Sequence, residues 1–250
     1  MNLEGKVCLV TGGVRGIGAA TALRLAKAGA DIAVQSRDAA SAAALEVKAG
    51  VEALGRRCLS LAADMAIPAS AARIVEETVS GLGGIDVLIH NAGAAAPGPF
   101  LSVTDEVWYH AFDVHVHAAF HLCRAAVPHM IPKKEGAIIL LGSTAGQRGV
   151  LGAAAYAIVK GALPQFSRVL ARELADHNIR VNCVSPGVIR TRFQDMLTDA
   201  QVKNNLENRI PLHREGTPDE VAQVIEVMVT NNFMTGEDVI LDGGLSMRIA

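Results

Sequence analysis

Tyr156 and Lys160 lie four residues apart on a predicted helix, so their side chains share one helix face. A phenol titrates near ~10 in water, which is too high for efficient proton transfer at neutral pH. A neighbouring ammonium favours the phenolate, so we expect Lys160 to lower the pKa of Tyr156. Ser143 precedes the tyrosine by thirteen residues and could donate a hydrogen bond to an oxygen where negative charge develops. The three residues are candidates for acid–base chemistry; the tyrosine–lysine pair alone would be an ordinary surface contact.

The glycine-rich stretch TGGVRGIG follows the apolar run at positions 7–10. Where a strand gives way to a helix, the free N–H groups of the first helical turn attract a phosphate. A side chain at Gly12, Gly16 or Gly18 would obstruct the turn, the approach of a pyrophosphate, or helix–strand packing. The stretch predicts a dinucleotide site, and an ordinary glycine-rich turn is the alternative. Its spacing is GxxxGxG rather than the commoner GxGxxG, and no phosphate loop of NTP-hydrolysing type occurs.

Strand-like and helix-like patterns alternate along all 250 residues and must position these groups. Apolar runs predict strands at 6–11, 31–35, 58–63, 87–90, 137–141, 180–185 and 238–241. Helical periodicity predicts intervening helices such as 19–28, 41–54 and 69–81, and Thr217, Pro218 and Glu220 form the N-cap, first-turn proline and capping box of a later one. The alternation predicts one α/β domain over residues 1–250, with a Rossmann-type doubly wound sheet of about seven parallel strands flanked by helices on both faces.

The bulk composition narrows the classes of partner and compartment. Half of the residues are apolar and the formal net charge is -2, so neither a nucleic acid nor a membrane is an expected partner. The four cysteines are scattered, which favours buried free thiols over a metal knuckle. The N-terminus has no apolar secretory segment and no apolar run is long enough to span a bilayer. A cytoplasmic location is therefore expected.

Five motifs in order make the sequence resemble the short-chain dehydrogenase/reductase family. The leading threonine and GxxxGxG spacing come first, and HNAG at 90–93 is similar to the family's NNAG segment. Ser143 after the fifth predicted strand, the YxxxK pair and NCVSPG at 182–187 follow in the family's order. The resemblance covers nearly the whole chain and is closest to single-domain reductases of the 3-oxoacyl type. It implies a small-molecule carbonyl or secondary alcohol substrate and a homotetramer.

The resemblance also implies roles for individual residues. Tyr156 would donate or accept the proton, Lys160 would bind the nicotinamide ribose and tune the tyrosine, and Ser143 would orient the substrate carbonyl. The implied cofactor contacts, besides these and the glycines, are Ile17, Asp64, Asn91, Ala92, Gly93, Pro186, Gly187, Ile189 and Thr191. No metal is implied.

His115 departs from the family pattern. The family has an asparagine here that holds a water for proton relay, whereas this chain reads DVHVHA at 113–118. An imidazole can donate and accept, and its ordinary pKa lies near neutrality. His115 is therefore a working substitute, the residue of a slower enzyme, or the mark of lost catalysis; we favour the first. His90, in place of the first asparagine of NNAG, is expected to be structural.

The end of the second predicted strand bears on the choice of nicotinamide. A carboxylate at this position would bind the adenosine ribose and repel a 2′-phosphate. The position is Ser36, which has no charge, and Arg37 follows it. Arg15 lies inside the glycine-rich turn, so two guanidinium groups could bracket a 2′-phosphate. We expect NADP(H) to be preferred, with NAD(H) as the alternative.

Three residues near the His115 segment have the spacing of metal ligands on a helix. Asp113, His117 and His121 recur every four residues and could supply ligands from one helix face. One stripe offers at most three ligands, and no partner is evident elsewhere. A polar or subunit-contacting face is the favoured interpretation.

Substrate specificity is expected in the loops 94–100 and 145–154 and in a lid at 189–213. No fixed site for an anionic group is evident, so an uncharged or weakly polar substrate is expected. Arg190 and Arg192 could nevertheless bind an acidic group or the cofactor's phosphates. The leading hypothesis is an NADP(H)-dependent oxidoreductase. The alternative is a catalytically impaired nicotinamide-binding regulatory or scaffold protein. A nucleotide-sugar epimerase or dehydratase would need a longer chain.

Overall fold

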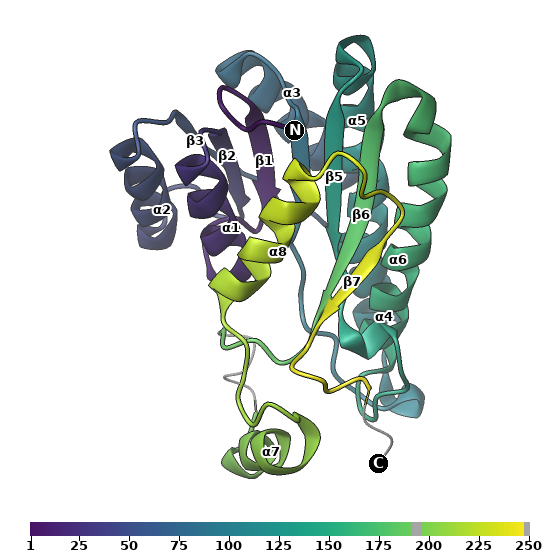
Figure 1. Ribbon diagram of the computed structural model, residues 1–250. Helices are drawn as coiled ribbons and strands as arrows, with labels where there is room; N and C mark the ends of the chain where they lie inside the picture. The colour runs from purple at the N-terminus through teal and green to yellow at the C-terminus, as the bar shows by residue number, and fades with distance from the viewer. Residues whose placement is uncertain (192–196, 248–250) are drawn as a thin grey trace.

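The computed structural model describes residues 1–191 and 197–247. Its strands form one parallel sheet in the order β3-β2-β1-β4-β5-β6-β7 (Figure 1). The strands are β1 Val7–Thr11, β2 Asp31–Ser36, β3 Cys58–Ala62, β4 Val87–His90, β5 Gly136–Leu141, β6 Ile179–Pro186 and β7 Asp238–Leu241. This confirms the predicted Rossmann-type sheet. Every predicted strand ends within one residue of the observed one, because continuous apolar runs are what a doubly covered parallel strand requires.

Helices cover both faces of the sheet. The helices α1 (Gly16–Lys27), α2 (Ala42–Ala53) and α8 (Pro218–Thr230) pack on one face, and α3 (Pro68–Leu82), α5 (Ala118–Met130) and α6 (Ala154–Leu174) pack on the other. Successive residues of β1 alternate between the two cores: Leu9 joins the α3–α5–α6 side, whereas Cys8 and Val10 join the α1–α2–α8 side. Both layers are visible in Figure 1.

The first residues of the helices distinguish α1 from its neighbours. Thr217 and Glu220 form the predicted capping box of α8, in which the carboxylate accepts the Thr217 N–H at 2.8 Å. Ser41 caps α2 in a simpler way. The N-cap of α1 is Arg15, whose side chain makes no capping hydrogen bond. The positive end of α1 is therefore open to an acceptor from outside the helix.

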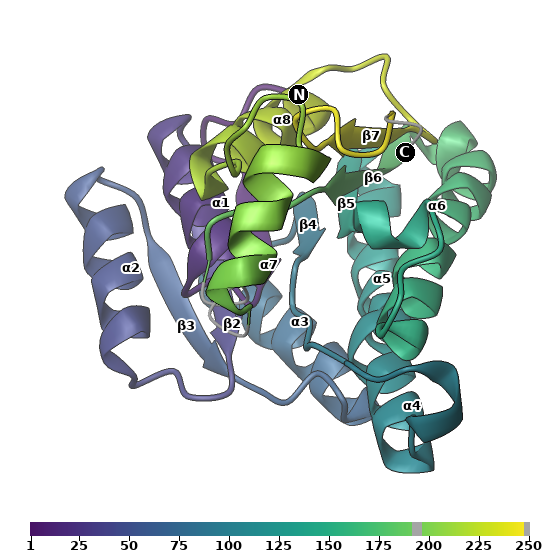
Figure 2. The same ribbon diagram turned by 90° about the horizontal axis from the view of Figure 1, so that it is seen from below.

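Two segments lie beyond the carboxyl ends of the strands. The helix α4 (Asp105–Phe112) leads through a π-helical turn, Asp113–His117, directly into α5. The short α7 (Asp199–Asn204) and the π-helical turn Asn205–Arg209 stand off the end of the sheet (Figures 1 and 2). They belong to the segment predicted as a lid, of which residues 192–196 lie outside the described part.

Within residues 1–191 and 197–247, no helix has both the length and the apolar character needed to cross a bilayer.

Candidate active site

A row of polar side chains crosses the carboxyl edge of the sheet. Gln35, Thr11 and His90 are register partners on β2, β1 and β4, and all three are buried. The Gln35 side chain accepts the Gly12 N–H at 2.9 Å and donates to the Ala63 carbonyl at 2.7 Å. The buried amide therefore holds the start of the glycine-rich turn against the end of β3.

The hydroxyl of Thr11 continues this network toward β4. Its oxygen accepts the backbone N–H groups of Asn91 and Ala92 at 3.1 and 3.0 Å. The hydroxyl proton is then free to be donated to His90 Nδ1 at 3.0 Å, and His90 Nε2 donates to the His115 carbonyl at 3.1 Å. Burial lowers the pKa of His90 to about 4, so the ring stays neutral. The expectation that His90 is structural agrees with these contacts.

Three of the four glycines in the turn are required for different reasons. Gly12 and Gly16 have φ of +60° and +52°, where a side chain is strained. A Cβ on Gly12 would lie 2.9 Å from Asn91 Nδ2, and one on Gly16 would lie 3.1 Å from Thr191 Cγ2. A Cβ on Gly18 would lie 2.2 Å from the Gly12 carbonyl oxygen. Backbone conformation and close packing thus require the glycines, and the turn they form leaves the α1 N-terminus accessible.

Tyr156 and Lys160 occupy the first two turns of α6, and Ser143 follows β5. The Ser143 oxygen accepts the Ala145 N–H at 3.1 Å, and its hydroxyl hydrogen-bonds the phenol of Tyr156. The Lys160 ammonium donates to the Leu141 carbonyl at 2.6 Å and lies 5.7 Å from the centroid of the Tyr156 ring. The predicted trio is therefore brought together by the ends of β5 and α6.

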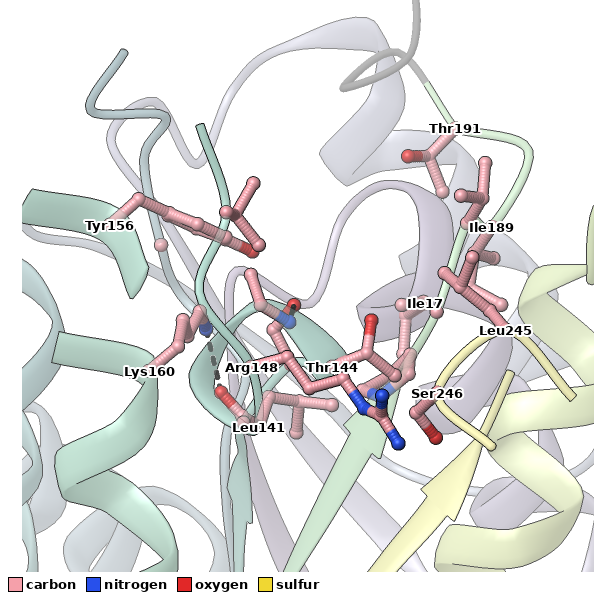
Figure 3. A pocket seen from close by; sticks show the side chains of 18 of the residues that line it. Ile17, Leu141, Thr144, Arg148, Tyr156, Lys160, Ile189, Thr191, Leu245 and Ser246 are labelled. Carbon is pink, nitrogen blue, oxygen red and sulfur yellow. Dashed lines mark hydrogen bonds between the residues drawn. The ribbon is translucent and has the colours of Figure 1, made fainter. Parts of the chain in front are cut away.

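One cavity of about 460 Å³ joins this trio to the glycine-rich turn. In Figure 3, Tyr156 and Lys160 enter it from one side and Ile17, Ile189 and Thr191 from the other. The predicted site residues that line it are Ile17, Asn91, Gly93, His115, Ser143, Tyr156, Lys160, Pro186, Gly187, Ile189 and Thr191. Two distant parts of the sequence thus form one site at the carboxyl edge of the sheet, where doubly wound folds bind ligands.

Comparison with known proteins agrees with this geometry. The family model described as enoyl-(acyl carrier protein) reductase matches residues 12–246. The chain belongs to the short-chain dehydrogenase/reductase family. It is 34% identical over 249 residues to the 3-oxoacyl-[acyl-carrier-protein] reductase of Escherichia coli, covering 99% of this chain and 100% of that one. It is also similar to a short chain dehydrogenase from Burkholderia cenocepacia solved in complex with NADP, with a TM-score of 0.90, 34% identity and coverage of 98% and 99%.

A metagenomic blue fluorescent protein solved in complex with NADPH is similar as well. Its TM-score is 0.91 at 37% identity, and the match covers 98% of this chain and 100% of that chain. A Mycobacterium tuberculosis relative, described as an uncharacterized oxidoreductase, is 35% identical over 248 residues, which are 98% of this chain and 93% of that protein. Membership of the family therefore rests on matches that run through the whole chain.

In this short-chain dehydrogenase/reductase the pKa of Tyr156 departs from our prediction. Burial raises it above the ordinary phenol value, and the hydrogen bond from Ser143 only partly opposes this. Burial outweighs the attraction of the phenolate to the Lys160 ammonium, which donates to the Leu141 carbonyl and lies 5.7 Å from the ring centroid. Burial also lowers the pKa of Lys160 to about 8. The predicted lowering of the Tyr156 pKa is therefore wrong for the protein alone, and Tyr156 is a neutral phenol at neutral pH.

The pKa of His115 also differs from our prediction. Burial, followed by the Lys160 ammonium, lowers its pKa to about 2, so the expectation of a pKa near neutrality is wrong. Its Nε2 lies 3.0 Å from the Ala94 carbonyl oxygen and 3.2 Å from the Ala94 nitrogen. The ring stands edge-on to Tyr156 at 5.9 Å between centroids. Within the described residues Nδ1 has no hydrogen-bond partner, although it is buried.

A neutral His115 makes a prediction about pH dependence. His115→Asn should leave the shape of the pH–rate profile unchanged between pH ~5 and ~9, because the wild-type ring stays uncharged throughout that interval. The measurement is kcat/KM against pH for both proteins with the same substrate. A wild-type limb near pH ~6.5 that disappears in His115→Asn would show that the ring titrates in the working enzyme.

The predicted adenosine end lies away from the cavity. Arg15 and Arg37 are exposed, and neither has an ion pair within residues 1–191 and 197–247. Ser36 ends β2 and donates to the Asp38 carbonyl at 2.8 Å. Asp64 is exposed beyond β3. Two unpaired guanidinium groups near the uncapped end of α1 are compatible with an anionic group there.

Two of the three side chains considered as metal ligands are paired with each other. The Asp113 carboxylate and His117 Nδ1 are 2.8 Å apart, and His121 packs edge-on against Phe120. In the part of the chain that the structure describes, no group of three or more histidine, cysteine or acidic side chains could hold a metal ion. That no metal is required stays a prediction.

Sequence reasoning missed two sets of residues. Gln35 lies within an apolar run. Only its position at the carboxyl end of a predicted strand, beside the glycine-rich turn, could have indicated its role. Thr144, Leu245 and Ser246 also line the cavity, although no motif marks them. Arg148, Asn208 and Arg209 lie within the loops predicted for substrate specificity, but no local pattern singles them out.

Proposed function

We propose that this protein is an NADP(H)-dependent oxidoreductase that interconverts a carbonyl compound and a secondary alcohol. The main observation behind the proposal is the shared cavity. Tyr156 and its hydrogen-bond partner Ser143 line it together with Ile17 of the glycine-rich turn. A relative named 3-oxoacyl-[acyl-carrier-protein] reductase and similar structures solved with NADP or NADPH support the same class of enzyme.

The residues of this chain fit the implied dinucleotide. The turn of Gly12 and Gly16 leaves the N-terminus of α1 uncapped for a diphosphate. Asn91, Gly93 and Thr191 line the cavity between this turn and α6, so they would flank the nicotinamide half. When bound, the nucleotide supplies the hydride that the side chains themselves cannot provide.

Each catalytic side chain then has one task. Tyr156 donates its phenolic proton to the carbonyl oxygen during reduction and accepts it back during oxidation. Ser143 donates a hydrogen bond to the same oxygen, where negative charge develops. Lys160 is held by the Leu141 carbonyl, and its ammonium favours the phenolate once Tyr156 has given up its proton.

The test is NADPH oxidation by the purified protein against a panel of a 3-oxoacyl thioester, a cyclic ketone and a sugar-derived ketone. Turnover of one compound in the panel would support the proposal. Tight NADPH binding with no turnover across the panel would favour the alternative, a regulatory or scaffold protein that binds nicotinamide.

The arginines predict the choice of nucleotide. Arg37→Gln should lower kcat/KM for NADPH about tenfold and leave that for NADH nearly unchanged, because one charge-assisted contact to the 2′-phosphate is removed. Arg73→Gln serves as the control, since that exposed arginine is paired with Glu77 on α3. A wild-type enzyme that prefers NADH would contradict the assignment.

The assembly and location remain predictions. Exposed apolar side chains on α4, α5 and α6, among them Tyr109, Phe120 and Ile158, are compatible with burial in a homotetramer. The cytoplasmic location rests on the sequence argument alone. A single domain over residues 1–250 and a closing motion of 189–213 are likewise proposed.

A further inference from the structure

The charged groups of the cavity all have one sign. Among the described residues that line it, those with a formal charge are Lys160, Arg148 and Arg209, and no aspartate or glutamate joins them. His115 and Tyr156 are neutral at neutral pH, as argued above. The formal charges on the described lining residues are therefore all positive, which favours an anionic ligand in this cavity.

The two arginines reach the cavity from separate segments. Arg148 follows the short helix Thr144–Gly146, in the loop after β5. Arg209 ends the π-helical turn Asn205–Arg209, and its Nη1 donates to the buried Asn205 Oδ1 at 2.7 Å. Because the partner of Arg209 is a neutral amide, this contact orients the guanidinium without cancelling its charge.

Neutral donors accompany these cations. Asn208 and Ser246 line the same cavity, and Figure 3 shows Arg148 and Ser246 among the side chains that surround it. The backbone of Ser246 is fixed because its N–H donates to Asp242 Oδ2 at 2.6 Å. The hydroxyl is therefore presented from an anchored turn after β7.

Two other arginines in this region do not line this cavity. Arg190 donates to Glu215 at 3.0 Å. Arg214 is paired with Glu220. Our expectation that Arg190 could bind an acidic group is therefore not supported. Arg192 lies outside the described residues.

We propose that Arg148 and Arg209 bind an anionic group, a carboxylate or a phosphate, on the substrate whose carbonyl is reduced at Tyr156. This rests on the proposed function and replaces the sequence-based expectation of an uncharged substrate. A guanidinium pairs with either anion through two parallel N–H donors. The glycine-rich turn and Arg37 remain the sites for the phosphates of the nucleotide.

The experiment compares matched substrates in the holoenzyme. A series of keto acids of increasing chain length is assayed beside the methyl ester of each, with a keto phosphate as a separate arm. Wild type should show a KM about tenfold lower for the best acid than for its ester, since the ester keeps the carbonyl and loses the charge. The keto acid and keto phosphate arms show which anion is preferred.

Variants assign the effect to the residues. Arg209→Gln and Arg148→Gln should each raise KM for the acid about fivefold to tenfold, leave kcat within about twofold, and leave KM for the ester unchanged. Arg190→Gln is the matched control and should change none of these values. The Kd of NADPH should be the same in all four proteins, which separates a substrate anion from the phosphates of the nucleotide.

The outcomes separate this inference from the proposed function. Reduction of acids and esters with equal KM, or equal losses for both in Arg209→Gln, would overturn the anionic subsite while leaving the oxidoreductase intact. A raised Kd for NADPH in Arg209→Gln would assign the arginine to the nucleotide and also overturn it. If no carbonyl compound of either charge were reduced, the proposed function itself would fail.

Discussion

Replacing Tyr156 with phenylalanine should lower kcat for carbonyl reduction by about 10³-fold, with little change in NADPH affinity. The substitution removes the phenolic proton and keeps the ring, which contacts His115 edge-on and packs within the cluster that includes Ala155 and Val159. Because burial raises the pKa of Tyr156, the phenol is protonated at neutral pH and suited to act as an acid. The measurements are single-turnover NADPH oxidation and NADPH fluorescence titration.

The chain offers a matched control, because its other tyrosine is Tyr109. That side chain is 61% exposed on α4, so Tyr109→Phe should retain full turnover. Turnover in Tyr156→Phe within about threefold of wild type would remove the phenol from the mechanism. Loss of NADPH binding in the variant would instead show that the ring is needed to build the nucleotide site.

The sequence was sufficient to predict the strands and most residues of the candidate site. Strand ends were predictable because each buried parallel strand is a short apolar run bounded by polar or glycine-rich residues. Ser143, Tyr156 and Lys160 could be assigned together because their order and spacing resemble those of the family, and the structure places them at one edge of the sheet. The i, i+4 spacing alone would not have distinguished Tyr156 and Lys160 from an ordinary surface pair.

Burial and register were beyond those patterns. The sequence placed a lysine beside Tyr156, but the direction of its ammonium depends on the Leu141 carbonyl, a contact between β5 and α6. The pKa values of Tyr156 and His115 follow from desolvation, which needs the packed structure. Likewise, Arg209 lines the cavity although it lies far in sequence from Ser143 and Tyr156.

The two histidines that depart from the family motifs are in contact with each other. His90 Nε2 donates to the backbone carbonyl of His115 across 25 positions of sequence, so the ring at one position supports the π-helical turn that holds the other. A linear comparison treats them as separate departures. In the structure they are parts of one buried neutral network that begins at Thr11, which favours interpreting His115 as part of a working site.

Lys160→Met should lower kcat by about 10²-fold or more and should change stability in a direction that depends on pH. Activity falls because no ammonium remains 5.7 Å from the Tyr156 ring to favour the phenolate. The pKa of Lys160 is about 8 in the folded protein, against 10.5 for an unhindered lysine. Below pH ~8 the charge is present in both folded and unfolded states, so the folded protein bears the full desolvation penalty, roughly 3 kcal/mol.

As pH rises from ~8 to ~10, the folded wild type releases this proton while the unfolded chain keeps it, so the penalty shrinks and wild-type stability rises relative to Lys160→Met. The measurement is urea unfolding of both proteins across this interval, with Lys27→Met as the control, because Lys27 is exposed on α1. Lys160→Met removes the desolvation penalty but also the hydrogen bond to the Leu141 carbonyl, which is stronger where the amine is charged. The slope of the stability difference is therefore the decisive quantity: a flat difference between pH ~8 and ~10 would mean that Lys160 keeps its proton in the fold. In that case the Lys160 ammonium would not be desolvated, and its proposed effect on Tyr156, which depends on desolvation, would be contradicted.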